Sequence, residues 1–149
     1  MVNNRSVPAN LVLPHLYYEH VEEALHFLIR TFGFTEYYRF ALPDGRLHGA
    51  MLYRGEAWVM LKSLGRHCAS PASLGATTQS MMVFVDDVEA HYRHSQSAGA
   101  QIAEELIETE YGEKHYATLD IEGHLWQFAQ HVNDVHPTEW GASMADPAE

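Results

Sequence analysis

Near the start of the chain, residues suited to acid–base chemistry recur at every second position. His15, Tyr17 and Glu19 do so in "LPHLYYEH". If this segment is a strand, alternate side chains point to one face, so an imidazole, a phenol and a carboxylate share a surface. An imidazole that titrates near neutral pH is a suitable general acid or base. The same groups could instead orient a bound organic molecule through hydrogen bonds.

A second set of residues has the composition of a pocket wall for a mid-sized organic ligand. Tryptophan, tyrosine and phenylalanine rings offer flat stacking surfaces, and methionine side chains adapt to irregular shapes. Histidine, serine and glutamine add hydrogen-bonding groups. The expected ligand-binding residues are His15, Tyr17, Trp58, Met60, Ser80, Met82, Phe84 and Gln127. Trp126 and Phe128 have the opposite parity to Gln127 in "DIEGHLWQFAQH", so we expect them in the core.

Strands must hold these residues in place, and the chain offers the same pattern of elements twice. An apolar run at 11–18 precedes a helical pattern that ends at Gly33, and a run at 80–85 precedes a helix that Asp86 should cap. We expect His91 and His94 of this second helix to face solvent. Three further strand candidates follow each helix, separated by turn signals. They are 35–42, 47–54 and 57–63 in the first half, and 101–108, 115–121 and 124–131 in the second half.

The sequence therefore predicts an α+β fold of two βαβββ modules, which form a curled mixed sheet, or cup, with the helices outside. We expect a single domain over 1–149. Its predicted parts are module one at about 11–63, a linker at about 64–78, module two at about 79–131 and a C-terminal tail at 132–149. The linker is assigned from its Ser, Gly, Ala and Pro content.

Composition narrows the classes of partner. The chain has 9 Lys and Arg against 20 Asp and Glu, a net charge of −11 with histidine neutral. Such a chain repels nucleic acid and anionic lipid; the charge favours either solubility or a cationic ligand. The one cysteine, Cys68, excludes an internal disulfide. No apolar run approaches the ~20 residues of a membrane span, and "MVNNRSVPAN" is unlike a secretion signal, so we expect a cytoplasmic protein.

Two stretches of the second half carry a family resemblance. "VDDVEAHYRHSQSAGA" and "YGEKHYATLDIEGHLWQF" resemble the second module of the vicinal oxygen chelate superfamily, which includes glyoxalase I, extradiol dioxygenases, and fosfomycin and bleomycin resistance proteins. "HVNDVHPTEW" is similar to the tail of the glyoxalase-like and bleomycin-resistance-like branch. The resemblance covers about Leu11 to Trp140, and implies the cup fold together with pairing of modules in a homodimer.

The resemblance also implies where a divalent metal would be bound. The family's ligands fall at Leu13, Ser80, Gln127 and Met60, or at Val59 if the alignment shifts by one residue. Leu and Met cannot replace the His and Glu that such a site needs. We therefore expect no metal and no cofactor at these positions. A relocated metal site that uses His15 and His48 is an alternative.

Two functions follow as expectations. The first is a metal-independent small-molecule-binding protein of the bleomycin-resistance type, which sequesters an aromatic natural product or antibiotic in the cup. Acidic charge adds the expectation that this molecule is cationic. The second is a glyoxalase-like or biosynthetic enzyme of the lyase, isomerase or dioxygenase type, with His15 as acid–base and Tyr17 or Glu19 assisting, or with the relocated metal. The sequence does not decide whether catalysis occurs.

Overall fold

A computed structural model describes residues 4–6 and 12–146. They form two compact units. Unit 1 runs to Thr78 and also contains the segment Asp120–His124, and unit 2 contains Gln79–Leu119 and the chain from Leu125 onwards. None of the helices within the described ranges is long and apolar enough to cross a membrane.

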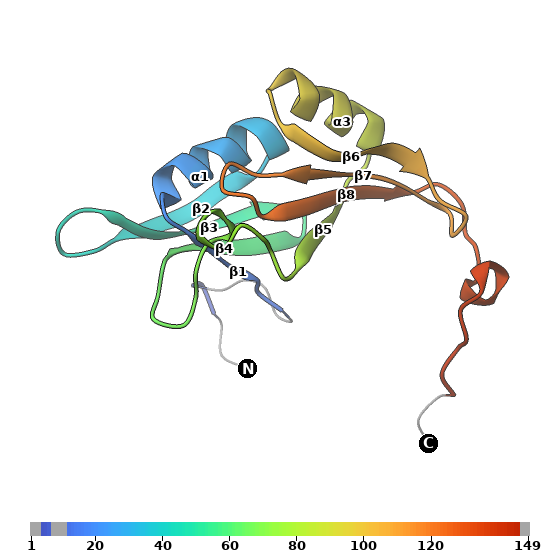
Figure 1. Cartoon of the computed structure of the whole chain (residues 1–149), viewed down its shortest axis with the longest axis horizontal. Coiled ribbons are helices and arrows are strands. Elements are labelled where there is room, and N and C mark those ends of the chain that lie inside the picture. The colour runs from blue at the N-terminus through green and yellow to red at the C-terminus, as the bar shows by residue number, and fades with distance from the viewer. Residues whose placement is uncertain (1–3, 7–11, 147–149) are drawn as a thin grey trace. The chain divides into compact units, whose positions relative to one another are not determined.

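Unit 1 is built as one βαβββ module. Its elements are β1 (His15–Tyr18), α1 (Val21–Phe27) with a continuing π-helical turn (Leu28–Phe32), β2 (Thr35–Ala41), β3 (Leu47–Arg54), β4 (Ala57–Ser63) and the short α2 (Pro71–Leu74). The sheet order is β1-β4-β3-β2, with β1 parallel to β4 and the other pairs antiparallel. The helix α1 packs on one face of this sheet (Figure 1).

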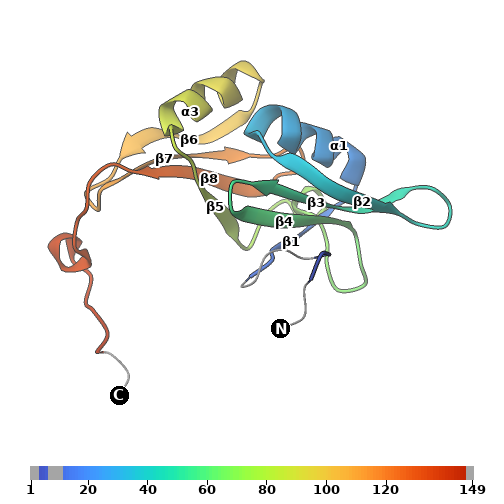
Figure 2. The same cartoon turned by 180° about the vertical axis from the view of Figure 1, so that it is seen from behind.

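Unit 2 repeats the pattern. Its elements are β5 (Ser80–Phe84), α3 (Val88–Ser97), β6 (Gln101–Glu108), β7 (Glu113–Leu119), β8 (Leu125–His131) and a 3-10 turn (Pro137–Trp140). The sheet order is β5-β8-β7-β6, again with one parallel pair, and α3 packs on this sheet (Figure 2). The predicted fold class is confirmed: α+β, with two βαβββ modules that each form a four-stranded mixed sheet.

Alternating burial explains why these segments are strands. In β1, Leu16 and Tyr18 are buried beneath α1, whereas His15 is exposed on the opposite face. In β8, Trp126 and Phe128 are fully buried, as predicted from their parity. The sheets thus bury one set of side chains against the helices.

Several predicted details are wrong in ways that have local causes. Asp87, not Asp86, caps α3, because its carboxylate accepts a 3.0 Å hydrogen bond from the Ala90 N–H. The strand expected at 115–121 runs over Glu113–Leu119, so the turn after it is longer than expected. His91, which the helical pattern placed toward solvent, is buried, and its Nδ1 lies 2.6 Å from the Tyr116 hydroxyl. Leu11 lies outside the described residues, and the predicted linker contains α2.

Gly112 fixes the start of the tail in unit 2. Its φ is +84°, and its carbonyl accepts hydrogen bonds from the N–H groups of Val132 and Asn133. A Cβ at this position would lie 2.1 Å from the Asn133 carbonyl oxygen. The close approach of two backbone segments therefore requires glycine here.

We expect Gly112→Ala to lower the free energy of unfolding by about 2–4 kcal/mol, because positive φ costs an L residue about 1–2 kcal/mol and the backbone must also shift. Gly45→Ala is the matched control, since Gly45 has φ +87° but open space around its Cβ position. Urea denaturation of both variants separates the two effects. Equal losses in the two variants would contradict a role for the contact with Asn133.

Candidate functional site

The sheet face of unit 1 that points away from α1 carries a cluster of five aromatic side chains, called here the aromatic face. Trp58 lies opposite Tyr53 in the β3–β4 register, and their ring centroids are 4.9 Å apart. The Tyr37 ring meets Trp58 edge to face at 5.3 Å. Tyr38 and Phe40 continue the cluster along β2, with centroids 6.2 Å apart.

A β-bulge in β2 makes this cluster possible. The register moves from Glu36 opposite Leu52 to Tyr38 opposite Met51, which leaves Tyr37 as the extra residue. A bulge turns an extra side chain out of strict alternation, and the Tyr37 and Tyr38 rings lie 5.6 Å apart. Both hydroxyls donate to carbonyl oxygens of the N-terminal segment, at 3.1 Å for Arg5 and 3.0 Å for Ser6.

Gly49 gives the Phe40 ring room to lie over β3. A Cβ on Gly49 would be 2.4 Å from the Phe40 Cζ atom. Phe40 lies opposite Gly49 in the register, so the ring covers the position where a side chain would stand. The contact between Phe40 and Gly49 cannot be predicted from alternation along a single strand, because it depends on how two strands pair.

Three predicted ligand-binding residues of unit 1 lie on the same sheet face as this cluster. His15 lies beside Met60 in the β1–β4 register, and Tyr17 beside Lys62. Met60 is 7% exposed, so its neighbours cover most of it. His15 is exposed, and Tyr17 is half-buried. The structure thus places His15, Tyr17 and Trp58 where a ligand on this face can reach them.

The surroundings of His15 and Tyr17 shift the pKa of each side chain in the direction that favours its neutral form. Partial burial, and secondly the positive charge of Lys62, lower the pKa of His15 from its ordinary value of 6.5. A hydrogen bond with the Cys68 thiol, and secondly burial, raise the pKa of Tyr17 from its ordinary value of 10.0. At neutral pH the imidazole is therefore uncharged and keeps one nitrogen as a hydrogen-bond acceptor.

The predicted ligand-binding residues of unit 2 also share one sheet face. Ser80, Met82 and Phe84 alternate along β5, and Met82 lies beside Gln127 of β8. Met82 and Phe84 are 41% and 55% exposed. The Phe84 ring stacks on the His131 imidazole, with a centroid distance of 5.3 Å and an interplanar angle of 21°. Sequence reasoning assigned His131 only to the end of a strand, because its stacking partner comes from β5.

The polar residues of "DIEGH" have a structural role within unit 1. The Asp120 carboxylate accepts a 2.6 Å hydrogen bond from the Tyr18 hydroxyl and 3.0 Å bonds from the Glu122 and His124 N–H groups. His124 Nε2 donates to the Tyr17 carbonyl at 2.8 Å. All three polar side chains of this loop are buried. Its acid groups and its imidazole therefore stabilise the fold and do not face a ligand.

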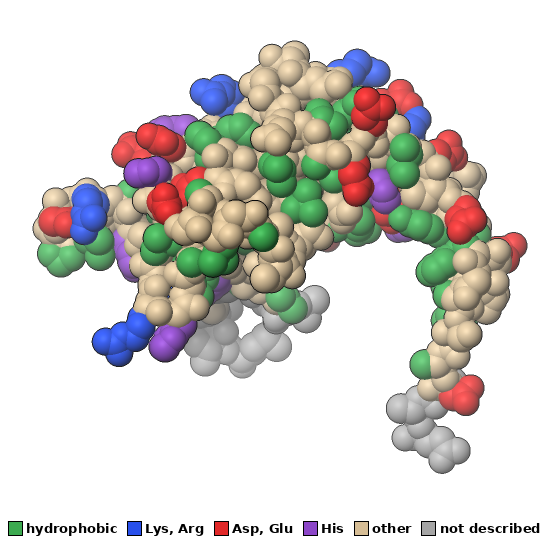
Figure 3. Space-filling view, viewed as in Figure 1, with side chains coloured by type: hydrophobic (Ala, Val, Ile, Leu, Met, Phe, Trp, Pro, Cys, Tyr) green, Lys and Arg blue, Asp and Glu red, His purple; other side chains and the backbone are tan. Residues whose placement is uncertain are grey.

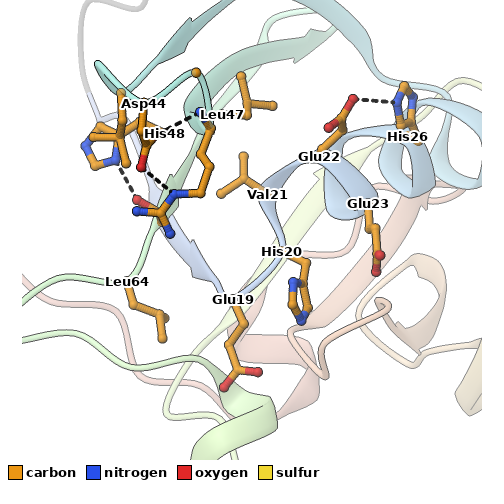
Figure 4. A pocket seen from close by; sticks show the side chains of 14 residues that line it. Glu19, His20, Val21, Glu22, Glu23, His26, Asp44, Leu47, His48 and Leu64 are labelled. Atoms are coloured by element: carbon orange, nitrogen blue, oxygen red, sulfur yellow. Dashed lines mark hydrogen bonds and ion pairs between the residues drawn. The ribbon is translucent and has the colours of Figure 1, made fainter.

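A broad groove lies on the other side of unit 1, between the first turn of α1 and the β2–β3 hairpin (Figure 4). Its volume is about 1190 Å³, and its lining includes Glu19, His20, Glu22 and His48. β1 ends at Tyr18, so Glu19 leaves the strand alternation and lines this groove instead of the face that carries His15. The structure therefore separates Glu19 from His15 and Tyr17.

His15 and His48, the proposed relocated metal pair, lie on opposite faces of the sheet. His15 lies beside Met60, whereas His48 Nδ1 is 2.5 Å from the hydroxyl of Ser63, three residues further along β4. Within residues 4–6 and 12–146, no three His, Cys, Asp or Glu side chains converge as a metal ion requires. The family's ligand positions do not fit a divalent ion either, because Leu13 and Met60 have no suitable donor.

Comparison with known proteins establishes the family to which the chain belongs. Residues 10–128 match the model of the glyoxalase/bleomycin resistance protein/dioxygenase superfamily. The chain belongs to this superfamily. It is 32% identical to TioX from Micromonospora sp. ML1, with a TM-score of 0.70 over 82% of this chain and 98% of that chain.

Two further proteins are similar to this chain, one in structure and one in sequence. A bleomycin resistance determinant encoded on the transposon Tn5 has a TM-score of 0.64 over 82% of this chain and 98% of its own, at 22% identity, and so supports the shared fold. The uncharacterized protein Rv0887c of Mycobacterium tuberculosis is 28% identical over 141 residues, which are 91% of this chain and 83% of that protein.

Proposed function

We propose that this protein binds planar aromatic molecules without a metal ion, and that it sequesters a natural product or antibiotic in the manner of a bleomycin resistance protein. The observation that carries the proposal is the gathering of five aromatic rings on one sheet face, the aromatic face. Stacking on such rings is worth about 1–3 kcal/mol per contact. Neutral His15 would accept a hydrogen bond from the ligand and so orient it.

The charge of the chain supports a cationic ligand. With −11 overall, the protein attracts cations and raises their local concentration. Figure 3 shows acidic side chains on several separate parts of the visible face, with hydrophobic side chains between them. Attraction of this kind is long-range and weakens with salt, whereas stacking specifies a flat ligand.

A thermal-shift screen tests the proposal. Cationic, neutral and anionic planar aromatics of similar size should be compared at low and high salt. We expect the cationic compounds to stabilise the protein most at low salt, because binding to the folded state shifts its apparent stability. Stabilisation only after a divalent metal is added, with the metal found at one equivalent by elemental analysis, would instead support a metal-dependent enzyme.

A metal-free enzyme is the second candidate, and the lowered pKa of His15 favours it, since the basic form of the imidazole predominates at neutral pH. In this reading His15 acts as acid–base and Tyr17 assists. Turnover that His15→Ala abolishes while ligand affinity is retained would establish catalysis. Equal loss of turnover and affinity would leave His15 as a binding residue.

We also propose that the two units act as one functional domain and that the protein is a homodimer. Large apolar side chains of unit 2 remain exposed in the single chain, among them Ile107, Trp140 and Met144. Exposed apolar surface of this kind commonly marks an interface, and two-fold pairing is the commonest oligomeric form.

Light scattering at micromolar concentration should therefore give twice the chain mass of 16.9 kDa. Trp140, whose ring lies 5.5 Å from that of Tyr111, is the predicted brace of the contact. Trp140→Asp should shift the protein toward the monomer, and Leu74→Asp, a charge placed on an exposed leucine of unit 1, is the control. A monomeric wild-type protein would contradict the proposal.

A further inference from the structure

Unit 2 contains a carboxylate–imidazole pair that the binding site proposed above does not use. Glu113 and His115 are two residues apart on β7 and share the face of the sheet that carries Phe84 and Gln127. His115 Nδ1 lies 3.3 Å from Glu113 Oε1. Only 9% of the His115 side chain and 8% of the Glu113 side chain are exposed. Such burial of two titratable groups is costly unless each has a partner.

The pair satisfies only part of its hydrogen-bonding capacity. Among the described residues, His115 Nε2 has no hydrogen-bond partner, and the second oxygen of Glu113 has only the imidazole of His131, at 3.9 Å. Both atoms keep some exposure to solvent. Both therefore remain open to a molecule on this sheet face.

The carboxylate decides which nitrogen of His115 carries the proton. An ionised carboxylate only accepts hydrogen bonds, so the Nδ1 atom that faces Glu113 must donate. In the neutral imidazole the Nε2 atom is then an acceptor. With Glu113 ionised and His115 neutral, Glu113 would be a positioning residue that presents the Nε2 lone pair.

Aromatic side chains border this acceptor. His131 lies opposite Glu113 in the β7–β8 register and stacks on Phe84. The Tyr111 ring lies 6.4 Å from that of His115. A flat ligand stacked on the free face of this Phe84–His131 stack would have its edge beside the Glu113–His115 pair.

We propose that the Glu113–His115 pair recognises a hydroxyl or N–H group on the edge of an aromatic ligand, with His115 Nε2 as the acceptor. This inference rests on the proposed function, in that the protein must bind aromatic molecules. It adds the ligand class, which is a phenol or an N–H heteroaromatic compound. His115 lies opposite Ala129, two residues or about 7 Å along β8 from Gln127, and Glu113 lies opposite His131, four residues or about 13 Å from it. The pair is therefore adjacent to the family's ligand position and does not include it.

The test compares β-naphthol with its methyl ether by fluorescence titration at neutral pH. The two probes have the same ring system and differ in the hydrogen-bond donor. We expect the wild-type protein to bind β-naphthol about tenfold more tightly, the effect of one hydrogen bond at about 1.4 kcal/mol per tenfold change. His115→Leu should reduce this ratio to about one. Glu113→Gln should reduce it to about three, because the preferred tautomer is lost while the acceptor remains.

The ratio within each variant is independent of a general loss of stability. His94→Leu, which removes an exposed imidazole from α3 of the same unit, is the matched control and should keep the wild-type ratio. A wild-type ratio near one, or a ratio that survives His115→Leu, would overturn the inference. Tight binding of both probes without preference would leave the proposed function standing, whereas no binding of either would count against both.

Discussion

Asp120→Ala is expected to lower the free energy of unfolding by about 3–5 kcal/mol. The change strands the Tyr18 hydroxyl and the N–H groups of Glu122 and His124, all of which donate to this carboxylate. A buried donor left without a partner costs about 1–3 kcal/mol. Since a shift of 1 kcal/mol moves the melting temperature by about 2–4 °C in a chain of this size, the melting temperature should fall by about 6–20 °C.

Two controls separate this network from a general effect of losing an aspartate. Asp44→Ala removes an exposed carboxylate that is bonded only to its neighbour Arg46 among the described contacts, and should cost at most about 0.5 kcal/mol. Asp120→Asn keeps an oxygen acceptor and should cost less than half as much as Asp120→Ala. Urea denaturation measures all three, and a loss below about 1 kcal/mol for Asp120→Ala would contradict the network.

The same network gives stability a dependence on alkaline pH. Complete burial, and secondly the negative charge of Asp120, raise the pKa of Tyr18 well above its ordinary value of 10.0. The folded state therefore keeps this proton at a pH where the unfolded state loses it. Stability from this source is full below about pH 10 and declines as the pH rises above that value. Tyr18→Phe should remove this part of the decline.

Glu122 of the same loop explains how α1 begins without a capping side chain of its own. The N-terminal residue His20 makes no side-chain cap. Instead, the Glu122 carboxylate accepts the Glu19 N–H at 2.7 Å and the His20 N–H at 2.9 Å. A negative charge at this end also complements the helix dipole. The cap comes from more than a hundred residues away in sequence, so no local pattern could have revealed it.

The elements of the fold could be predicted because their signals are local. Two-residue alternation places Leu16 and Tyr18 against α1, and Gly33, at φ +80°, ends the first helical segment as expected. What sequence reasoning missed depends on distant partners. His91 is an outward residue by helical pattern alone, yet it is buried against Phe128, with ring centroids 4.1 Å apart.

For the candidate site, the alternation of side chains along each strand predicted which residues share a sheet face, but not every aromatic residue on that face. His15, Tyr17 and Trp58 lie on one face because their strands are regular. Tyr37 joins them only through the bulge, which breaks the alternation that the prediction used. The dense "EYYRF" was the available signal, since consecutive aromatic residues on an edge strand cannot all be core. The Glu113–His115 pair was missed because the predicted strand began two residues too late.

Trp58→Ala is expected to weaken the binding of a planar aromatic ligand by about 5- to 150-fold. Loss of one stacking surface costs about 1–3 kcal/mol, and about 1.4 kcal/mol corresponds to tenfold in affinity. Trp58 is half-buried and touches the rings of Tyr37 and Tyr53 at the open face. Its removal should therefore cost only about 1–2 kcal/mol of stability, less than the about 3–5 kcal/mol of a fully buried tryptophan.

Trp126→Ala is the matched comparison, because Trp126 is fully buried in unit 2 and stacks on Phe128. It should lose about 3–5 kcal/mol of stability, with affinity unchanged in whatever fraction stays folded. Trp58→Phe should keep most of the affinity, since a smaller ring still stacks. Calorimetric titration and urea denaturation of the three variants give opposite patterns for a binding ring and a core ring. If Trp58→Ala retains affinity for a confirmed ligand but loses as much stability as Trp126→Ala, the aromatic face is packing rather than a binding surface.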